Sequence, residues 1–141
     1  MIKEWQKLGL KFENILLYHE VPQSLYEELD CEQYKGMSEP PDEYKLRDSI
    51  VIIDDLPNIM KQTKNAAFVE KLFLALVHHL NCTVFLILQN LYPGDNRYRS
   101  LLSNCNYLIA MKSRNTYSTL QQIQRQNFPY MRGILHDAMT K

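Results

Sequence analysis

The chain has 141 residues, 45% of them hydrophobic and only four of them glycine, so it is one domain or part of one, and glycine-rich low-complexity classes are excluded. Its 16 basic and 16 acidic side chains cancel, but residues 1–60 carry a net charge of −7 and residues 97–141 one of +6. The basic C-terminal third allows a surface for phosphates or nucleic acid, and a mixed solvated surface is the alternative.

The cysteines and the apolar runs bear on the cellular compartment. Cys31, Cys82 and Cys105 lie far apart, without the spacing of a zinc site or of a disulfide framework. Scattered cysteines in a chain that shows no signal peptide favour a reducing compartment. The longest apolar runs are too short or too interrupted to span a bilayer. We therefore expect an intracellular protein that is not secreted and has no membrane partner.

Apolar periodicity and turn residues divide the first half of the chain into five elements. In order, they are a helix over 2–12, a strand at Asn14–His19, a helix over 24–34, a polar loop over 35–48 and a strand over 49–55. Ser24 and Glu27 support the second helix, because they have the spacing of a capping box.

The second half continues the alternation of helices and strands. Its predicted elements are a helix over 65–80, a strand over 82–89, a short helix near Arg97–Ser103, a strand over 107–112 and a helix over 116–128. The strands are apolar along their length, as in strands that are buried on both faces. This order predicts an α/β fold with a parallel, doubly wound sheet and right-handed crossovers.

Two adjacent aspartates, Asp54 and Asp55, close the apolar strand in "SIVIIDDLPNIM". Ligands of open α/β sheets bind at the carboxyl ends of the strands, where both carboxylates are expected. There Asp54 would hold Mg²⁺, directly or through water, and Asp55 would orient the attacking water in phosphoanhydride hydrolysis. The alternative is a pair of aspartates that only ends the strand and caps the following turn.

Polar and basic side chains follow the next strand. Gln89 ends this strand in "FLILQN", and a glutamine beside a metal carboxylate can reach a γ-phosphate or the lytic water. Arg97 and Arg99 come next, and an arginine presented across a subunit boundary stabilises charge on a transferring phosphoryl group. The alternatives are a turn residue for Gln89 and surface charge for the two arginines.

The sequence contains no phosphate-binding loop. Such a loop needs glycines for close backbone approach and a Lys-Ser/Thr pair for the phosphates and Mg²⁺. The glycines of this chain are isolated, at Gly9, Gly36, Gly94 and Gly133, and no G-x-x-x-x-G-K-[ST] occurs. Candidate groups for the metal and the water are therefore present without the group that holds the phosphates.

Four segments, taken in order, carry a family resemblance: "FENILLYHEVPQSLYEEL", "IVIIDDL", "HHLNCTVFLILQNLYPGDNRYRSLLSNCNYLIAMKSRN" and "LQQIQRQNFPY". This pattern resembles the DNA-packaging ATPases of large DNA viruses and of related self-synthesising transposons, which belong to the FtsK/HerA group of P-loop ATPases. The resemblance covers residues 12–130. Its most specific parts are the "HHLN" helix end, the strand that follows to "QN", and "NCNYLIAMKSR".

The resemblance implies a P-loop NTPase-like fold that uses ATP and Mg²⁺, in a homo-oligomeric ring that moves double-stranded DNA into a viral capsid. By this similarity Asp54 is the Walker B magnesium ligand, Asp55 the acidic catalytic base and Gln89 the sensor glutamine. Arg99 lies where the family carries an arginine and is the candidate for a finger that acts on a neighbouring subunit's nucleotide. Residues 1–141 are then a single partial ATPase domain, expected in the host cytoplasm, the nucleus or a virus factory.

The chain departs from the family at its start. In the family, a strand, a P-loop and a helix precede the segment that matches "ENILLYHE". Three explanations are open: a fragment of a longer reading frame, one half of a split gene whose partner is the missing N-terminal half, or a decayed copy. The loop "YPGDNRYR" lacks the expected lysine and "MKSRN" lacks the usual proline, which favours divergence or decay. We expect the isolated chain to be inactive as an ATPase.

Two other interpretations come from different functional classes. A response-regulator receiver domain also has an acidic pair after a strand, but its phosphoacceptor must be an aspartate, and the corresponding position here is Gln89. The stronger alternative is a non-enzymatic module that assembles with intact subunits or contacts DNA. A sheet that lacks its first strand leaves one edge uncovered, which invites a partner.

Overall fold

A computed structural model describes residues 12–37, 40–56, 59–89 and 97–109, together with Gln121, Gln124 and Arg125. The chain forms two compact units, Met1–Gln89 and Asn90–Lys141, and each is described by itself. The first unit holds the sheet and the candidate site.

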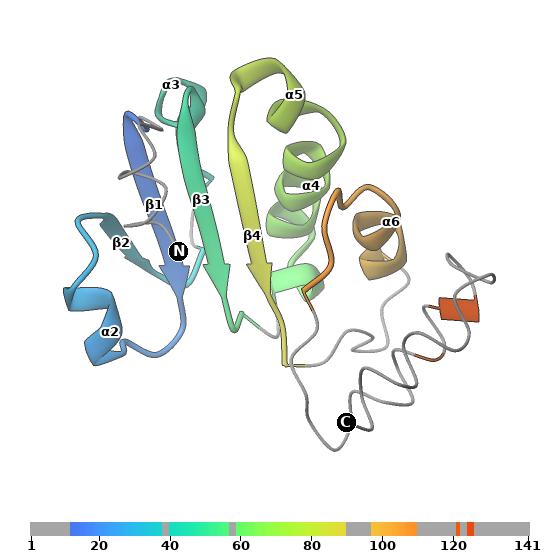
Figure 1. Cartoon of the computed structure of the whole chain (residues 1–141), viewed down its shortest axis with the longest axis horizontal. Helices are drawn as coiled ribbons and strands as arrows, with labels where there is room; N and C mark the ends of the chain where they lie inside the picture. Colours follow the sequence, from blue (N-terminus) through green and yellow to red (C-terminus); the bar gives the residue numbers. More distant parts are fainter. Residues whose placement is uncertain are drawn as a thin grey trace. The chain divides into compact units, whose positions relative to one another are not determined.

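The sheet of the first unit has four strands, all parallel, with flanking helices (Figure 1). The strands are β1 (Asn14–His19), β2 (Glu32–Lys35), β3 (Ser49–Asp54) and β4 (Thr83–Ile87). Their order in the sheet is β2-β1-β3-β4. The helical elements are α2 (Ser24–Glu27), α3 (Glu43–Leu46), η1 (Ile59–Lys61), α4 (Thr63–Lys71), η2 (Leu72–Leu76) and α5 (Val77–Leu80). The predicted α/β class and parallel sheet are confirmed.

The two central strands, β1 and β3, are buried on both faces. Successive side chains of a strand point to opposite faces, so Leu17, Ile50 and Ile52 share one face. There they form a buried cluster with Tyr26 of α2. The residues that alternate with them are also fully buried: Leu16, Val51 and Ile53. This double burial explains why both strands read as continuous apolar runs.

A long helical segment runs from α4 through η2 to α5 and flanks the sheet in Figure 1. The η2 stretch is π-helical, and its ends continue directly into α4 and α5. The segment buries one apolar side of the helix, made of Ala66, Phe68, Val69, Leu72, Phe73, Leu76 and Leu80. The helix predicted over 65–80 is therefore confirmed, with a start two residues earlier. Within the described ranges, no helix is long and apolar enough to cross a membrane.

The helix predicted over 24–34 is wrong beyond Glu27. Helix α2 ends at Glu27, and the chain then forms β2, which pairs in parallel with β1. Ser24 is the first helical residue, and the N-cap residue Gln23 makes no side-chain capping bond, so the expected capping box is not formed. Pairing with β1 satisfies the backbone groups on one side of this segment and overrides its local helix signal.

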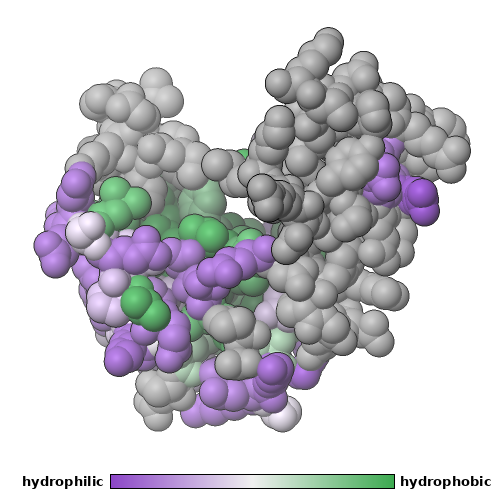
Figure 2. Space-filling model, turned by 90° about the horizontal axis from the view of Figure 1, so that it is seen from below, coloured by the Kyte–Doolittle hydropathy of each residue, from purple (hydrophilic) through white to green (hydrophobic). Residues whose placement is uncertain are grey.

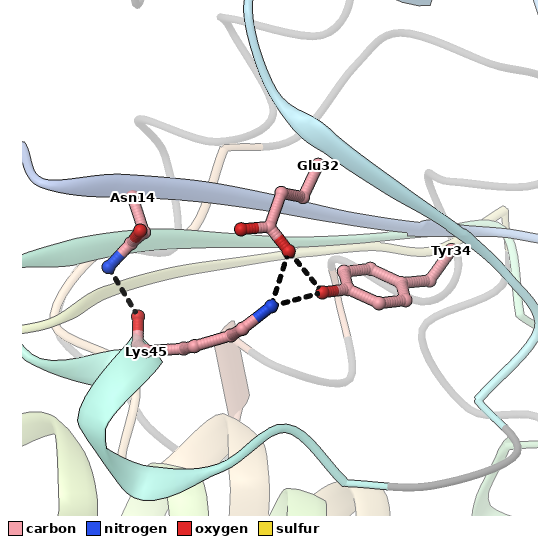
Figure 3. A network of polar contacts seen from close by, with 4 residues as sticks. All are labelled: Asn14, Glu32, Tyr34 and Lys45. Atoms are coloured by element: carbon pink, nitrogen blue, oxygen red, sulfur yellow. Dashed lines mark hydrogen bonds and ion pairs between the residues drawn. The ribbon is translucent and has the colours of Figure 1, made fainter.

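A polar network fastens the edge strand β2 to α3 (Figure 3). Lys45 Nζ donates to Glu32 at 2.6 Å and to the hydroxyl of Tyr34 at 3.2 Å, while Tyr34 donates to Glu32. The side-chain amide of Asn14 donates to the backbone carbonyl of Lys45 at 3.2 Å. The ring of Tyr34 stacks on Tyr18, with 5.0 Å between centroids. These tertiary contacts explain a strand where local pattern predicts a helix.

Two further expectations are corrected. The polar loop predicted over 35–48 contains the short helix α3, whose Leu46 is fully buried. The strand predicted over 107–112 is not formed at Tyr107, Leu108 and Ile109, which are irregular and exposed by 88%, 40% and 70%. An apolar run becomes a strand only where another strand bonds its backbone, and the described residues give this one no strand partner.

The remaining predicted helices have mixed outcomes. The short helix near Arg97–Ser103 is confirmed as α6 (Arg97–Ser103), in the second unit. The helix predicted over 116–128 is helical at its three described residues, which are Gln121, Gln124 and Arg125. The helix predicted over 2–12 lies outside the described residues, except for Phe12.

Candidate functional site

Because the strands run parallel, their carboxyl ends meet at one edge of the sheet. His19, the last residue of β1, lies beside Asp54, the last residue of β3, and Asp54 lies beside Ile87 of β4. Figure 2 views the molecule from the side at which the strands end, where hydrophilic residues lie next to hydrophobic ones. Asp54, Asp55 and Gln89, three of the four predicted site residues, gather at this edge.

The carboxylate of Asp54 points to the face of the sheet that α2 covers. Asp54 lies on the same face of β3 as Ile50 and Ile52, at two-residue spacing, and ends their row with a charged side chain. Tyr26 of α2 packs on the same row, and its hydroxyl donates a hydrogen bond to Oδ2 of Asp54. The half-buried Asp54 is thus held by a side chain 28 residues away in sequence.

The carboxylate of Asp55 turns the other way, toward β4. Asp55 follows the strand with φ of +47°, a left-handed conformation that aspartate tolerates better than most residues do. Its backbone N–H donates to the carbonyl of Ile87 at 3.2 Å. Its Oδ2 accepts a hydrogen bond of 2.6 Å from Nε2 of Gln89. The two aspartates therefore diverge, so that Asp54 contacts α2 and Asp55 contacts the end of β4.

Arg99, the fourth predicted site residue, lies in α6. That helix belongs to the second unit, and its helical backbone is what the structure describes of this position. The structure therefore does not test the finger role that the resemblance implies, which stays a prediction.

Sequence reasoning missed two residues of this edge, Tyr26 and His19. His19 is buried, and its ring packs at a tilt against the ring of Tyr26, with 5.0 Å between centroids. A signal for His19 was present, because it ends a predicted parallel strand as Asp54 does. No such signal marked Tyr26, which the sequence pattern placed in a longer helix and which reaches Asp54 only through the packing of α2.

The environment of Tyr26 favours its neutral form. Burial is the largest cause, followed by the hydrogen bond to Asp54 and the negative charges of Asp54 and Asp55, and together these raise the pKa of Tyr26 to about 12. Tyr26 therefore stays protonated at neutral pH and acts as a hydrogen-bond donor. It holds Asp54 in place through this hydrogen bond.

The carboxylate oxygens at this edge suit a hard cation that takes most of its ligands from water and from a bound phosphate. Among the described residues, no group of three or more His, Cys, Asp or Glu side chains could hold a metal. Mg²⁺ does not need such a cage, because it is commonly bound by one or two carboxylates, by waters and by substrate phosphates. Asp54 supplies one such carboxylate, so the residues present fit Mg²⁺ bound together with a phosphate ligand.

No protein-family model, curated protein or solved structure matches this chain. Fold and site define an α/β protein with a four-stranded parallel sheet and two divergent carboxylates at its carboxyl edge. A more particular function has to be argued from the residues of that edge.

Proposed function

We propose that this chain is the Walker B and sensor portion of a P-loop ATPase of the DNA-packaging type, which couples ATP hydrolysis to translocation of double-stranded viral DNA. The observation that carries the proposal is the hydrogen bond of 2.6 Å between Gln89 and Asp55, directly after Asp54, at the ends of adjacent parallel strands. A carboxylate and an amide in contact at this position suit the orientation of a water for attack on a phosphoanhydride.

Each of the four candidate side chains has a proposed role. Asp54 would hold Mg²⁺, which neutralises charge on the phosphates when bound. Asp55 would accept a proton from the attacking water, and Gln89, in contact with Asp55, would orient that water. Arg99, presented by a neighbouring subunit of a ring, would stabilise charge on the transferring phosphoryl group. The net charge of +6 over residues 97–141 would suit contact with DNA.

The sequence supplies no loop that could hold the ATP phosphates, so this function requires a P-loop from another segment or another chain. The 141 residues alone are therefore expected to show no turnover of ATP. The P-loop is the main phosphate-binding element of such an ATPase, so the proposed function depends most strongly on a P-loop supplied from elsewhere.

The test begins with the DNA upstream of the Met1 codon, which is read for an in-frame strand followed by G-x-x-x-x-G-K-[ST]. A chain extended by that segment is expected to hydrolyse ATP in the presence of Mg²⁺ and to be stimulated by duplex DNA. In that extended chain, Asp55→Asn should lower kcat by roughly 10²–10⁴, the usual loss on removal of a general base. An extended chain with an intact P-loop and no ATPase activity would contradict the proposal.

A second candidate is a non-enzymatic assembly module derived from such an ATPase, and one observation favours it. In the part of the chain that the structure describes, β4 pairs with β3 alone, and its apolar residues are only half-buried, with Ile87 exposed by 49%. An apolar strand with one unpaired edge is a site for strand addition by a partner. An upstream stop codon without a P-loop, together with binding to an intact homologous subunit, would favour this function.

A further inference from the structure

The contact between Tyr26 and Asp54 joins a buried hydroxyl to a carboxylate at the end of a buried row of side chains. Tyr26 belongs to a helix of one turn, yet its side chain is 5% exposed, within the cluster of Leu17, Ile50 and Ile52. Its hydroxyl is the one polar atom of its side chain, and it meets the carboxylate that ends the same row of residues. A buried hydroxyl needs a partner, and Asp54 is the partner that this face of the sheet offers.

Contacts from two strands hold Tyr26 in place. Nε2 of Gln33, in β2, donates to the backbone carbonyl of Tyr26 at 3.1 Å. The ring of His19, at the end of β1, packs against the ring of Tyr26 at 5.0 Å between centroids. Since both the main chain and the ring are fixed, the hydroxyl has a defined position relative to Asp54.

His19 adds an independent observation at this edge. Its side chain is 6% exposed, and its Nδ1 has no hydrogen-bond partner among the described residues. A buried polar atom without a partner is destabilising, so a water or a ligand oxygen is expected there. His19 is paired in register with Asp54, which places this atom on the strand next to the carboxylate.

We propose that Tyr26 is a positioning residue for Asp54, whose hydroxyl fixes Oδ2 and so presents Oδ1 to a divalent cation. The inference rests on the function proposed above, in which Asp54 is the metal ligand. The hydroxyl of Tyr26 occupies Oδ2 of Asp54, so Oδ1 is the oxygen that a cation would take. Without the hydroxyl, the carboxylate rotates about a broad torsion and its oxygens no longer hold one orientation.

Groups that orient metal ligands have a measurable effect, because their loss typically weakens metal binding 10- to 100-fold. The test is the affinity of the whole chain for Mn²⁺, a stand-in for Mg²⁺, measured by electron paramagnetic resonance in the presence of inorganic triphosphate, which supplies the phosphate oxygens that such a cation needs. We expect the unmodified chain to bind Mn²⁺ and Asp54→Asn to abolish this binding. Tyr26→Phe should lower the Mn²⁺ affinity about 10-fold or more.

Tyr34→Phe is the matched control. It also removes a tyrosine hydroxyl that donates to a carboxylate, Glu32, in the same sheet but away from Asp54. Thermal melting without metal, run on both variants, gives the loss of stability that each substitution causes. A merely structural role of Tyr26 predicts that Mn²⁺ affinity follows stability in both variants, whereas positioning predicts that it falls in Tyr26→Phe alone.

If Tyr26→Phe does not fold, Gln33→Leu takes its place, because Gln33 is exposed and holds Tyr26 by its main chain. A several-fold loss of Mn²⁺ affinity is then expected. Unchanged affinity in the folded variant, with binding still lost in Asp54→Asn, would overturn the positioning role and leave the proposed function standing. Equal Mn²⁺ binding by the unmodified chain and Asp54→Asn would overturn the metal role of Asp54 itself.

Discussion

The side-chain amide of Gln89 donates a hydrogen bond of 2.6 Å to Oδ2 of Asp55, although 34 residues separate the two. The same turn is tied to β4 by the backbone bond from Asp55 to the carbonyl of Ile87, at 3.2 Å. Asp55 leaves the strand with φ of +47°, which directs its side chain away from Asp54. A turn conformation and a neighbouring strand end therefore set the position of the proposed base.

The contact of Gln89 with Asp55 predicts an effect of charge. Gln89→Glu places a second carboxylate against Asp55, and the repulsion should make this variant less stable than Gln89→Ala by about 0.5–1 kcal/mol at pH 7, since Gln89 is exposed. Like charges raise the pKa of carboxyl groups in the folded state, so the penalty should shrink as the pH falls and these groups take up protons. Urea denaturation at pH 7 and pH 3.5 measures the difference, and a gap that stays constant between the two would contradict the contact.

The environment of Tyr26 predicts an alkaline limit to stability. Its pKa is raised to about 12, mainly by burial, whereas a tyrosine in the unfolded chain loses its proton near pH 10. The folded state therefore holds a proton that the unfolded state releases, so this stabilisation is complete below pH 10 and is lost as the pH rises from 10 to 12. Denaturation at pH 9 to 11.5 should show a shallower loss of stability in Tyr26→Phe than in the unmodified chain. Parallel curves would argue against the shift.

The central strands could be predicted from sequence because their signal is local. Strands β1 and β3 are each a run of apolar residues long enough for a strand, and burial on both faces produces such runs. Asp54, Asp55 and Gln89 could be placed at one edge for a related reason, since parallel strands bring their carboxyl ends together.

What the sequence could not show depends on tertiary contacts. The segment at β2 has charged and amide residues that suit a helix, and it becomes a strand because β1 and Lys45 bind it. Residues Tyr107 to Ile109 have a strand-like composition, but the described residues provide no strand beside them. Tyr26 reaches Asp54 because α2 packs on the sheet, which local sequence does not reveal.

Burial across the sheet predicts two different outcomes for the same substitution. Ile53 of β3 is fully buried between two neighbouring strands, so Ile53→Ala should lower the free energy of unfolding by about 2–5 kcal/mol. Ile87 of β4 is exposed by 49%, so Ile87→Ala should cost less than about 1 kcal/mol. Urea denaturation of the two variants gives both values. A large loss in Ile87→Ala would mean that a partner or another copy covers this end of β4.

The contact between Asn81, which follows α5, and Asp48, which precedes β3, predicts a change in stability that does not affect the candidate site. We call this contact the corner. Asn81 ends α5 with φ of +51° and ψ of +46°, and its Nδ2 donates to Oδ1 of Asp48 at 2.7 Å. Asn81→Gly keeps this backbone and loses one exposed hydrogen bond, whereas Asn81→Val forces a β-branched residue into the left-handed region, at a cost of about 1–2 kcal/mol. We therefore expect Asn81→Val to be less stable than Asn81→Gly in urea. This corner lies at the amino end of β3, opposite Asp54, so Mn²⁺ affinity should be equal in the two folded variants. Unequal affinities would show that the corner and the carboxyl edge are coupled.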